Sequence, residues 1–236
     1  MPWRGSLVVG AAEWETCGFS AANGTYRGPS TQQGYSPFST WTRGLAWAMT
    51  GFAEQLEFIA TRGDAELDAY GGRAEIESWM LDAARATCDF YIDQGTASDG
   101  IPYWDTGAPN LHKLADWRSR AAEPFNDHEP VDSSAAAIAA QGLLRLGRYL
   151  KNERYWQAGL TVARSLFAEP YLSTDSNHQG LLLHSVYHRP NGWDAVPPGA
   201  KVPAGESSMW GDYHARELAL YLKRVIEEGK YLKFFL

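Results

Sequence analysis

The sequence predicts an all-α fold, built as an incomplete toroid of helical hairpins with long loops between them. Five stretches carry apolar residues three and four positions apart, the spacing that places them on one face of a helix. A helix pair and its loop recur with a period of about 50 to 60 residues, which is typical of arrays and closed toroids of helical hairpins. No long alternation of apolar and polar residues predicts a sheet, although short β-hairpins could be accommodated in the loops.

The first two predicted helices cover residues 36–60 and 73–94 and are expected to pair as a hairpin. Each carries one apolar stripe at helical spacing. The stripe residues are Leu45, Met49, Phe52, Leu56 and Ile59 in the first helix, and Ile76, Met80, Ala84, Cys88 and Tyr91 in the second. Ser36 followed by Pro37 predicts the start of the first helix, because a capping side chain and a residue that needs no amide donor both favour a first turn.

Residues 96–130 form a long loop rich in Gly, Pro, Asp and Asn that contains the aromatic pair Tyr103 and Trp104. Loops of this length without secondary structure of their own are usually functional. We therefore predict that both rings contact a ligand, the alternative being that they fill the core.

A second hairpin follows, with predicted helices at residues 133–146 and 152–168. Asp132 precedes the first of these and is predicted to be its N-cap, because a carboxylate there accepts hydrogen bonds from the free amides of the first turn. A second loop, 169–208, contains several prolines, and the last predicted helix covers residues 210–228. This order of hairpin, loop, hairpin, loop and helix is expected for consecutive units of a toroid.

The whole chain, residues 1–236, is predicted to be one partial toroid domain. Residues 1–35 show no helical spacing and are expected to be irregular, whereas residues 36–228 hold the hairpins. A closed toroid of six hairpins needs twelve helices and well over about 300 residues, more than this sequence contains. Because a partial toroid would expose its inner faces, we expect self-association or a missing N-terminal half.

Composition excludes two classes of partner. The chain carries 21 Lys and Arg against 28 Asp and Glu, a net charge of −7, without a dense basic run, so nucleic acid is not expected. No apolar stretch approaches the roughly 20 residues of a membrane span, so no membrane association is expected. Residues 1–10 are too short and proline-broken for an export signal; we expect a cytoplasmic location, or a periplasmic one if a signal was truncated.

Arg43 and Trp47 form the first candidate binding pair. They are one helical turn apart and are predicted to share a face, so that a guanidinium and an indole point into one space. A guanidinium can hold a carboxylate through two parallel hydrogen bonds, and an indole offers its ring face to sugar C–H groups. The pair therefore suits an anionic sugar, the alternative being an arginine paired on the surface and a tryptophan in the core.

Four segments in fixed order resemble motifs of one enzyme family. They are QGYSPFSTWTRGLAWAMTGFA, DGIPYWDTGAP, DSSAAAIAAQGLLRL, and LLLHSVYHRP followed by ESSMWGDYHARELAL. Together they resemble the unsaturated glucuronyl hydrolases, glycoside hydrolase family 88, whose corresponding pattern for the first segment is close to HQGYxDxSxWxRGQAWxxYGFA. The resemblance covers residues 24–222 and implies an (α/α)6 toroid, with this chain matching its C-terminal part.

The resemblance implies a substrate site for an anionic oligosaccharide, lined by residues from all four segments. The predicted substrate-binding residues are Gln33, Trp41, Arg43, Trp47, Tyr103, Trp104, His184, His188, Ser207 and Trp210. Of these, Ser207 is expected to face the sugar carboxylate, and His184 and His188 to hydrogen-bond to the sugar. No carboxylate accompanies the two histidines at a spacing suited to a metal, so neither a metal nor another cofactor is expected.

Three positions depart from the family pattern. Gln32 replaces the histidine before the Gln-Gly pair, Leu45 replaces the glutamine after Arg-Gly, and Ser208 stands where an aliphatic residue is usual. These differences leave the substrate preference within the family open.

The chemistry implied by the resemblance is hydration of a vinyl ether. An aspartic acid protonates the C4=C5 bond of an unsaturated uronic acid and then activates water to attack C5, which releases the neighbouring sugar. The family's two catalytic aspartates have no counterpart in this sequence. Asp132 is better explained as an N-cap and Asp212 as a first-turn carboxylate, so Asp105, beside Trp104, is the one weak catalytic candidate.

Three functions therefore remain open. The first is a glycosidase acting on unsaturated uronic-acid oligosaccharides. This chain would supply its binding wall and would lack its catalytic acid. The second is a carbohydrate-binding or interaction fragment without catalysis. The third is another enzyme of the helical-toroid kind, such as an epimerase, because fold likeness does not fix the chemistry.

Overall fold

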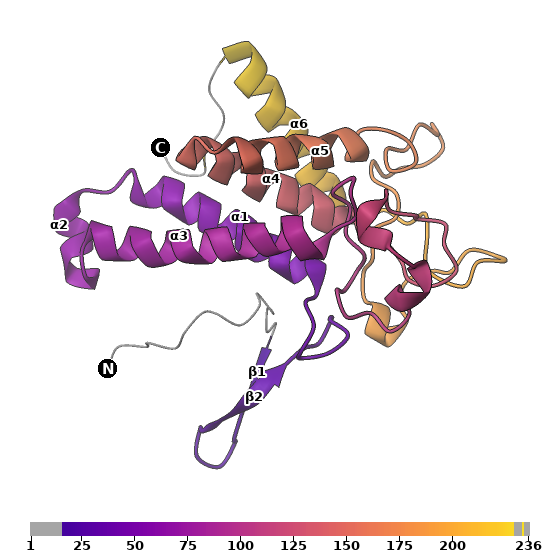
Figure 1. Cartoon of the computed structure of the whole chain (residues 1–236), viewed down its shortest axis with the longest axis horizontal. Coiled ribbons are helices and arrows are strands. Elements are labelled where there is room, and N and C mark those ends of the chain that lie inside the picture. Colours follow the sequence, from indigo (N-terminus) through magenta and orange to yellow (C-terminus); the bar gives the residue numbers. More distant parts are fainter. Residues whose placement is uncertain (1–15, 229–232, 234–236) are drawn as a thin grey trace.

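The computed structural model describes residues 16–228 and 233, so residues 1–10, for which no export signal was expected, lie outside the described residues. The long helices are α1 (Thr42–Ile59), α3 (Arg73–Phe90), α4 (Ser133–Leu150), α5 (Glu153–Leu166) and α6 (Met209–Glu228), with the short α2 (Asp64–Leu67) between α1 and α3 (Figure 1). The five helices predicted from apolar spacing are confirmed, and so is the all-α class. None of the described helices is long and apolar enough to cross a bilayer.

Helix α4 is the centre of the bundle. It packs against α1, α5 and α6, while α3 pairs with α1, so both predicted hairpins are present (Figure 1). Every residue of α4 from Ser133 to Gly147 is buried, which explains its many alanines, because small side chains allow neighbouring helices to approach on several faces.

Glycines set the closest approaches to α4. A β-carbon at Gly142 would lie 2.8 Å from backbone atoms of Met49 and Thr50 in α1, and one at Gly147 would lie 2.7 Å from the backbone nitrogen of Trp156 in α5. Both distances are shorter than any ordinary carbon contact. Backbone therefore packs directly against backbone at Gly142, between the two hairpins, and at Gly147, within the second hairpin.

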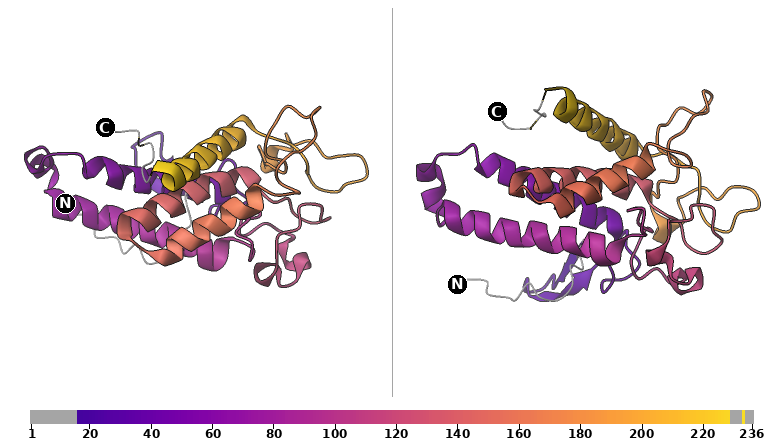
Figure 2. Two further views of the ribbon diagram at one scale, coloured as in Figure 1. Left: turned by 90° about the horizontal axis from the view of Figure 1, so that it is seen from above. Right: turned by 45° about the horizontal axis from the view of Figure 1, so that its top comes forward.

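The two long loops gather at one end of the bundle, the end at which α1, α4 and α6 begin (Figure 2). Hydrogen bonds fix the loops there. The amide of Thr42 at the start of α1 donates to the carbonyl of Trp104, and the amide of Ser133 at the start of α4 donates to the carbonyl of His184. This end of the bundle brings together the segments that carry the sequence motifs.

The prediction that the first helix starts at Ser36 is wrong, because α1 begins at Thr42. Trp41 is extended and pairs with Asp105 in an isolated antiparallel bridge, and the amide of Thr40 donates to the Thr106 hydroxyl. Residues 40–42 are thus held alongside the loop after Tyr103, a long-range pairing that a local capping signal does not report.

Residues 16–35, the described part of the segment predicted to be irregular, contain a regular hairpin. Strands β1 (Thr16–Phe19) and β2 (Tyr26–Ser30) pair as an antiparallel hairpin, while residues 1–15 lie outside the described part of the chain. The second helix is interrupted as well: α3 ends at Phe90 and continues as a single π turn, Tyr91–Gly95. The boundaries predicted for the helices at 133–146 and 152–168 agree closely with α4 and α5.

Candidate functional site

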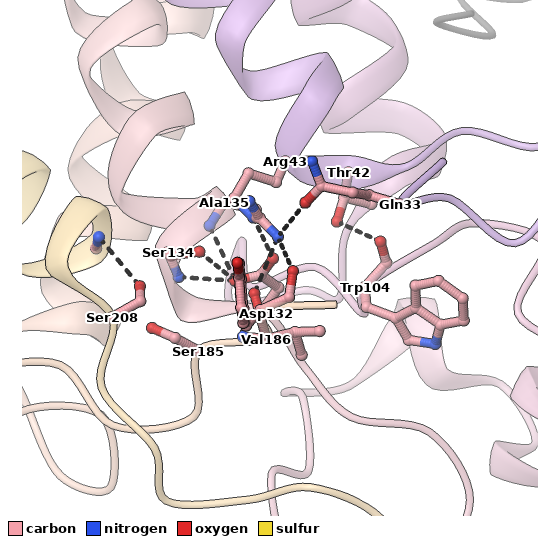
Figure 3. A network of polar contacts seen from close by, with 12 residues as sticks. Gln33, Thr42, Arg43, Trp104, Asp132, Ser134, Ala135, Ser185, Val186 and Ser208 are labelled. Carbon is pink, nitrogen blue, oxygen red and sulfur yellow. Dashed lines mark hydrogen bonds and ion pairs between the residues drawn. The ribbon is translucent and has the colours of Figure 1, made fainter. Parts of the chain in front are cut away.

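The guanidinium of Arg43, in the first turn of α1, is the centre of a buried polar network (Figure 3). Its Nε donates to Asp132 Oδ2 at 3.3 Å. Its Nη2 donates to the carbonyls of Tyr187 at 2.7 Å and Val186 at 3.0 Å, and to Gln33 Oε1 at 3.2 Å. One side chain thus joins α1, the start of α4, the loop before α1 and the loop before α6.

Asp132 is the N-cap of α4, as predicted. Its Oδ1 accepts from the amides of Ser134 at 3.0 Å and Ala135 at 3.3 Å, from the Ser134 hydroxyl, and from the amide of Val186 at 3.4 Å. The carboxylate is fully buried, and its negative charge is balanced by the helix N-terminus and by Arg43. Capping and ion pairing are therefore performed by the same group.

Two indole rings enclose the Arg43 guanidinium. Its central carbon lies 4.7 Å from the ring centroid of Trp41 and 4.9 Å from that of Trp210, distances at which a cation is attracted to a ring face. Trp210 is held in turn by a hydrogen bond from Nε1 to the Ser134 hydroxyl. Nε and Nη2 of Arg43 donate to protein oxygens, so this edge of the guanidinium is engaged within the fold.

Arg43 and Trp47, one turn apart on α1, have different contacts. Arg43 reaches toward the loops, whereas Trp47 is 40% exposed and packs edge-on against His214 of α6, with ring centroids 5.0 Å apart. Tyr213, 51% exposed, contacts the same imidazole at 5.0 Å. Trp47 and Tyr213 thus present exposed ring surface between α1 and α6, beyond the Arg43 network.

His214 supports this ring surface as a neutral imidazole. Its Nδ1 lies 2.8 Å from the Gln141 amide nitrogen, which can only donate, so Nδ1 accepts. Burial lowers the pKa of His214 to about 4. The imidazole consequently adds no positive charge near neutral pH.

The start of α6 is tied to the loop that precedes it. The Ser207 hydroxyl donates to the carbonyl of Leu182 and lies 2.8 Å from His178 Nε2. Asp212, in the first turn of α6 as predicted, accepts from the amides of Leu181 and Leu182 at 2.9 Å each. Ser207 therefore lies in the wall of this region with its hydroxyl already engaged by protein atoms.

Tyr103 and Trp104 belong to the core, contrary to the prediction that they contact a ligand. Trp104 is 3% exposed, and its Nε1 donates to Glu129 at 2.8 Å. Tyr103 is 2% exposed and packs edge-on against Trp117. The loop 96–130 folds over the rings of Tyr103, Trp104 and Trp117, which removes these three from solvent.

His184 and His188 are buried as well. The Nδ1 of His184 accepts from the amide of Gly205, and burial lowers the pKa of His184 to about 4. His188 packs behind the ring of Trp193 at 4.7 Å. Both histidines thus support the loop rather than facing solvent. Among the described side chains, no group of three or more His, Cys, Asp and Glu residues is placed to hold a metal ion.

Asp105, the weak catalytic candidate, has no exposed surface. Its two oxygens accept from the amides of Tyr35 and Gly107 at 2.8 Å each, and burial raises its pKa despite these bonds. A β-carbon at Gly34 would lie 3.2 Å from the carboxylate. Asp105 therefore fastens the loop before α1 to the loop after Trp104, and its burial argues against a catalytic role.

Glu54 is a carboxyl group that sequence analysis did not single out. It lies two helical turns beyond Trp47 on α1, and its side chain is 20% exposed. Burial raises its pKa, as do the neighbouring carboxylates Glu217 and Glu57, while Arg145 opposes the shift. A carboxyl group in such surroundings holds its proton to higher pH than an ordinary glutamate.

Comparison with known proteins identifies relatives of most of the chain. An unsaturated glucuronyl hydrolase from Formosa agariphila is 27% identical over 200 residues, which are 84% of this chain and 40% of that protein. The crystal structure of the unsaturated glucuronyl hydrolase of Bacillus sp. GL1 superposes with a TM-score of 0.65 at 25% identity, covering 95% of this chain and 49% of that one. This chain is homologous to the unsaturated glucuronyl hydrolases. No protein-family model matches it.

A third relative carries a bound sugar. A variant of the unsaturated glucuronyl hydrolase of Streptococcus agalactiae, complexed with dGlcA-GalNAc6S, superposes with a TM-score of 0.55 at 25% identity and covers 85% of this chain and 44% of that one. The chain thus spans about half the length of the unsaturated glucuronyl hydrolases that it matches. The predicted resemblance and the toroid fold class are confirmed.

The fold brings some of the predicted substrate-binding residues into contact with one another. Those gathered around one another are Gln33, Trp41, Arg43 and Trp210. Sequence analysis missed three exposed rings near them, those of Tyr187, Trp193 and Tyr213. The available signal was their position beside matched motif residues, in HSVYHRPNGW and in WGDYH.

Proposed function

We propose that this chain is part of a glycoside hydrolase that acts on unsaturated uronic-acid oligosaccharides by vinyl-ether hydration, and that it supplies a sugar-binding wall. The observation that carries the proposal is the Arg43 network at the common start of α1, α4 and α6, flanked by exposed aromatic rings. Homology to unsaturated glucuronyl hydrolases supports the choice of substrate.

The electrostatics of this end of the bundle suit a uronic acid. Three helix N-termini meet there, and each carries a partial positive charge that favours an anion. Asp132 offsets part of the positive charge of Arg43 and of the α4 N-terminus, so the attraction for a carboxylate comes from the positive charge of the helix ends and guanidinium that is left. The exposed faces of Trp47 and Tyr213 then stack on the sugar ring.

The proton donor is a separate question. The resemblance implies an aspartic acid, and no counterpart of it is found in this sequence. Asp105 is buried, whereas Glu54 is partly exposed on the same helix as Trp47 and has a raised pKa. If the chain hydrolyses substrate by itself, Glu54 is the group to replace first.

The second candidate function is carbohydrate binding without catalysis. It is favoured by the same observations that leave the acid unassigned: a complete polar network around Arg43, exposed rings, and a buried Asp105. This candidate and the leading one predict the same binding of an unsaturated oligosaccharide. They differ only in turnover.

The test is the loss of ultraviolet absorbance of the C4=C5 bond of unsaturated glycosaminoglycan disaccharides, alongside calorimetric binding. Turnover by the purified chain that Glu54→Gln abolishes and Asp105→Asn leaves in place supports a hydrolase with its acid on α1. Binding without turnover supports the non-catalytic candidate for this chain. Absence of binding to any unsaturated uronic acid contradicts both.

A further inference from the structure

A cavity of about 230 Å³ lies between the end of α3, helix α5 and the start of the loop 96–130. None of the residues that line it belongs to the Arg43 network or to the exposed rings described above. Three of its lining side chains are fully or almost fully buried, those of Tyr91, Leu143 and Val162. The cavity is therefore a separate hollow that reaches into the core, and the proposed function does not account for it.

The π turn Tyr91–Gly95 and the residues after it bound the cavity on one side. π turns are rare, and they occur frequently at functional sites. The Thr96 hydroxyl donates to the Tyr91 carbonyl at 3.2 Å, and the Tyr91 hydroxyl donates to the Gly100 carbonyl at 2.9 Å, so the start of the loop is tied to the turn. A β-carbon at Gly100 would lie 2.6 Å from Val162 Cγ2, which places the loop directly against α5. The walls of the cavity are thus formed before a ligand enters.

Most of the lining requires no hydrogen bond from a ligand. Leu143, Ala158 and Val162 contribute apolar surface. The hydroxyl of Thr161, which also lines the cavity, donates to the carbonyl of Gln157 at 2.9 Å. Because this donor is already satisfied, an apolar group can bind beside it without leaving it unpaired. The cavity therefore suits the apolar body of a small molecule.

Arg118, an exposed residue, lines the cavity on its solvent side. Its Nε donates to the carbonyl of Gln94 at 3.0 Å, and its central carbon lies 4.8 Å from the ring centroid of Trp117. These contacts hold the guanidinium in place, while no carboxylate of a described residue forms an ion pair with it. Asp93, the carboxylate that also lines the cavity, pairs with Arg154 at 2.6 Å. The positive charge left at the mouth of the cavity favours an anionic group on the ligand.

The volume of the cavity sets the size of the ligand. A dry apolar cavity of about 150 Å³ holds one benzene ring. This cavity is larger, at about 230 Å³, and has room for a carboxylate on such a ring. We propose that it binds a small carboxylate built on a single six-membered apolar ring, with the ring against Val162 and the carboxylate toward Arg118. The inference does not depend on the proposed function.

The experiment titrates the intact, isotope-labelled chain with three ligands that share a ring and differ in charge: benzoate, benzyl alcohol and benzylamine. Backbone amide resonances locate the bound ring. We expect benzoate to shift the amides of Ile92, Ala97 and Ala158, and to bind at least about fivefold more tightly than the other two ligands. Arg118→Gln should remove this preference, whereas Arg164→Gln, at an exposed arginine of α5 that does not line the cavity, should keep it.

A second variant, Ala158→Leu, fills the cavity and should abolish benzoate binding with an unchanged thermal midpoint. If Ala158→Leu lowers the midpoint, the ligand preference of Arg118→Gln, a surface change, decides the result. Undiminished benzoate binding by Ala158→Leu would overturn the proposal. So would shifts confined to other parts of the chain, equal binding of the three ligands, or no binding of benzoate. None of these results involves a uronic acid, so they leave the proposed function unaffected.

Discussion

Two buried arginine–carboxylate pairs join α1 to α4, in opposite directions. At the loop end, Arg43 of α1 pairs with Asp132 at the start of α4. In the bundle, Arg145 of α4 pairs with Glu57 of α1 at 2.8 Å, with Glu54 at 3.7 Å. All four main partners are nearly or fully buried, so their burial alone does not distinguish the pairs.

The pairs differ in what else they hold. Arg43 also donates to two backbone carbonyls of the loop before α6, and Asp132 also caps α4. Arg145 contacts side chains of neighbouring helices, including the ring of Tyr221 on α6. A buried ion pair between helices is often replaceable by apolar residues, whereas one that satisfies backbone groups is not. The loop-end pair therefore organises the functional region, and the inner pair fastens helices.

The largest effect is expected from Arg43→Met. The substitution leaves the Asp132 charge and the carbonyls of Val186 and Tyr187 buried without their donor, which should lower the free energy of unfolding by at least about 4 kcal/mol. Sugar binding should be lost with it. Urea denaturation measures the stability, and Arg62→Gln, at an exposed pair with Glu66, should stay within about 0.5 kcal/mol. A loss below about 1 kcal/mol would refute the role assigned to Arg43.

A double-mutant comparison separates the two pairs more sharply. Arg145→Met alone should cost about 3 kcal/mol, because Glu57 is left buried and charged, and adding Glu57→Leu should recover most of that loss. Arg43→Met combined with Asp132→Leu should recover little, since the cap of α4 is then lost as well. Equal recovery at both sites, measured by denaturation of the single and double variants, would show that the two pairs are equivalent.

A smaller loss of stability is expected on acidification, and it should come from two buried histidines. His184 in the loops and His214 on α6, which packs against Trp47 and Gln141, both have pKa values lowered by burial from 6.5 to about 4. Because the unfolded chain takes up these protons first, stability is intact above pH 6.5 and falls as the pH drops toward 4. Each histidine should account for about 2 kcal/mol after allowance for solvent screening.

Unfolding measured from about pH 7 to about pH 4 tests this dependence. His214→Gln should flatten part of the slope, because glutamine accepts the Gln141 hydrogen bond without titrating. An unchanged slope in His214→Gln would assign the acid sensitivity to other groups.

Sequence patterns predicted the helices and the cap well, because both depend on local rules. Apolar spacing reports which side of a helix is buried, and Asp132 accepts from amides two and three residues later. The loops were less predictable. Whether Trp104 faces a ligand or the core depends on Glu129, and whether Arg43 is free depends on carbonyls more than 140 residues away. Such partners are set by the tertiary fold and leave no periodic signal.

The close contact of Gly142 with α1 has a consequence for how this fold tolerates change. The separation of α1 and α4 is limited by the backbone atoms of Met49 and Thr50, and not by the size of the side chains around them. We therefore expect substitutions elsewhere on the two helices to change their spacing little. Arg43 and Asp132 lie on the same two helices, nearer the loops, so a larger residue at Gly142 should also move this pair apart.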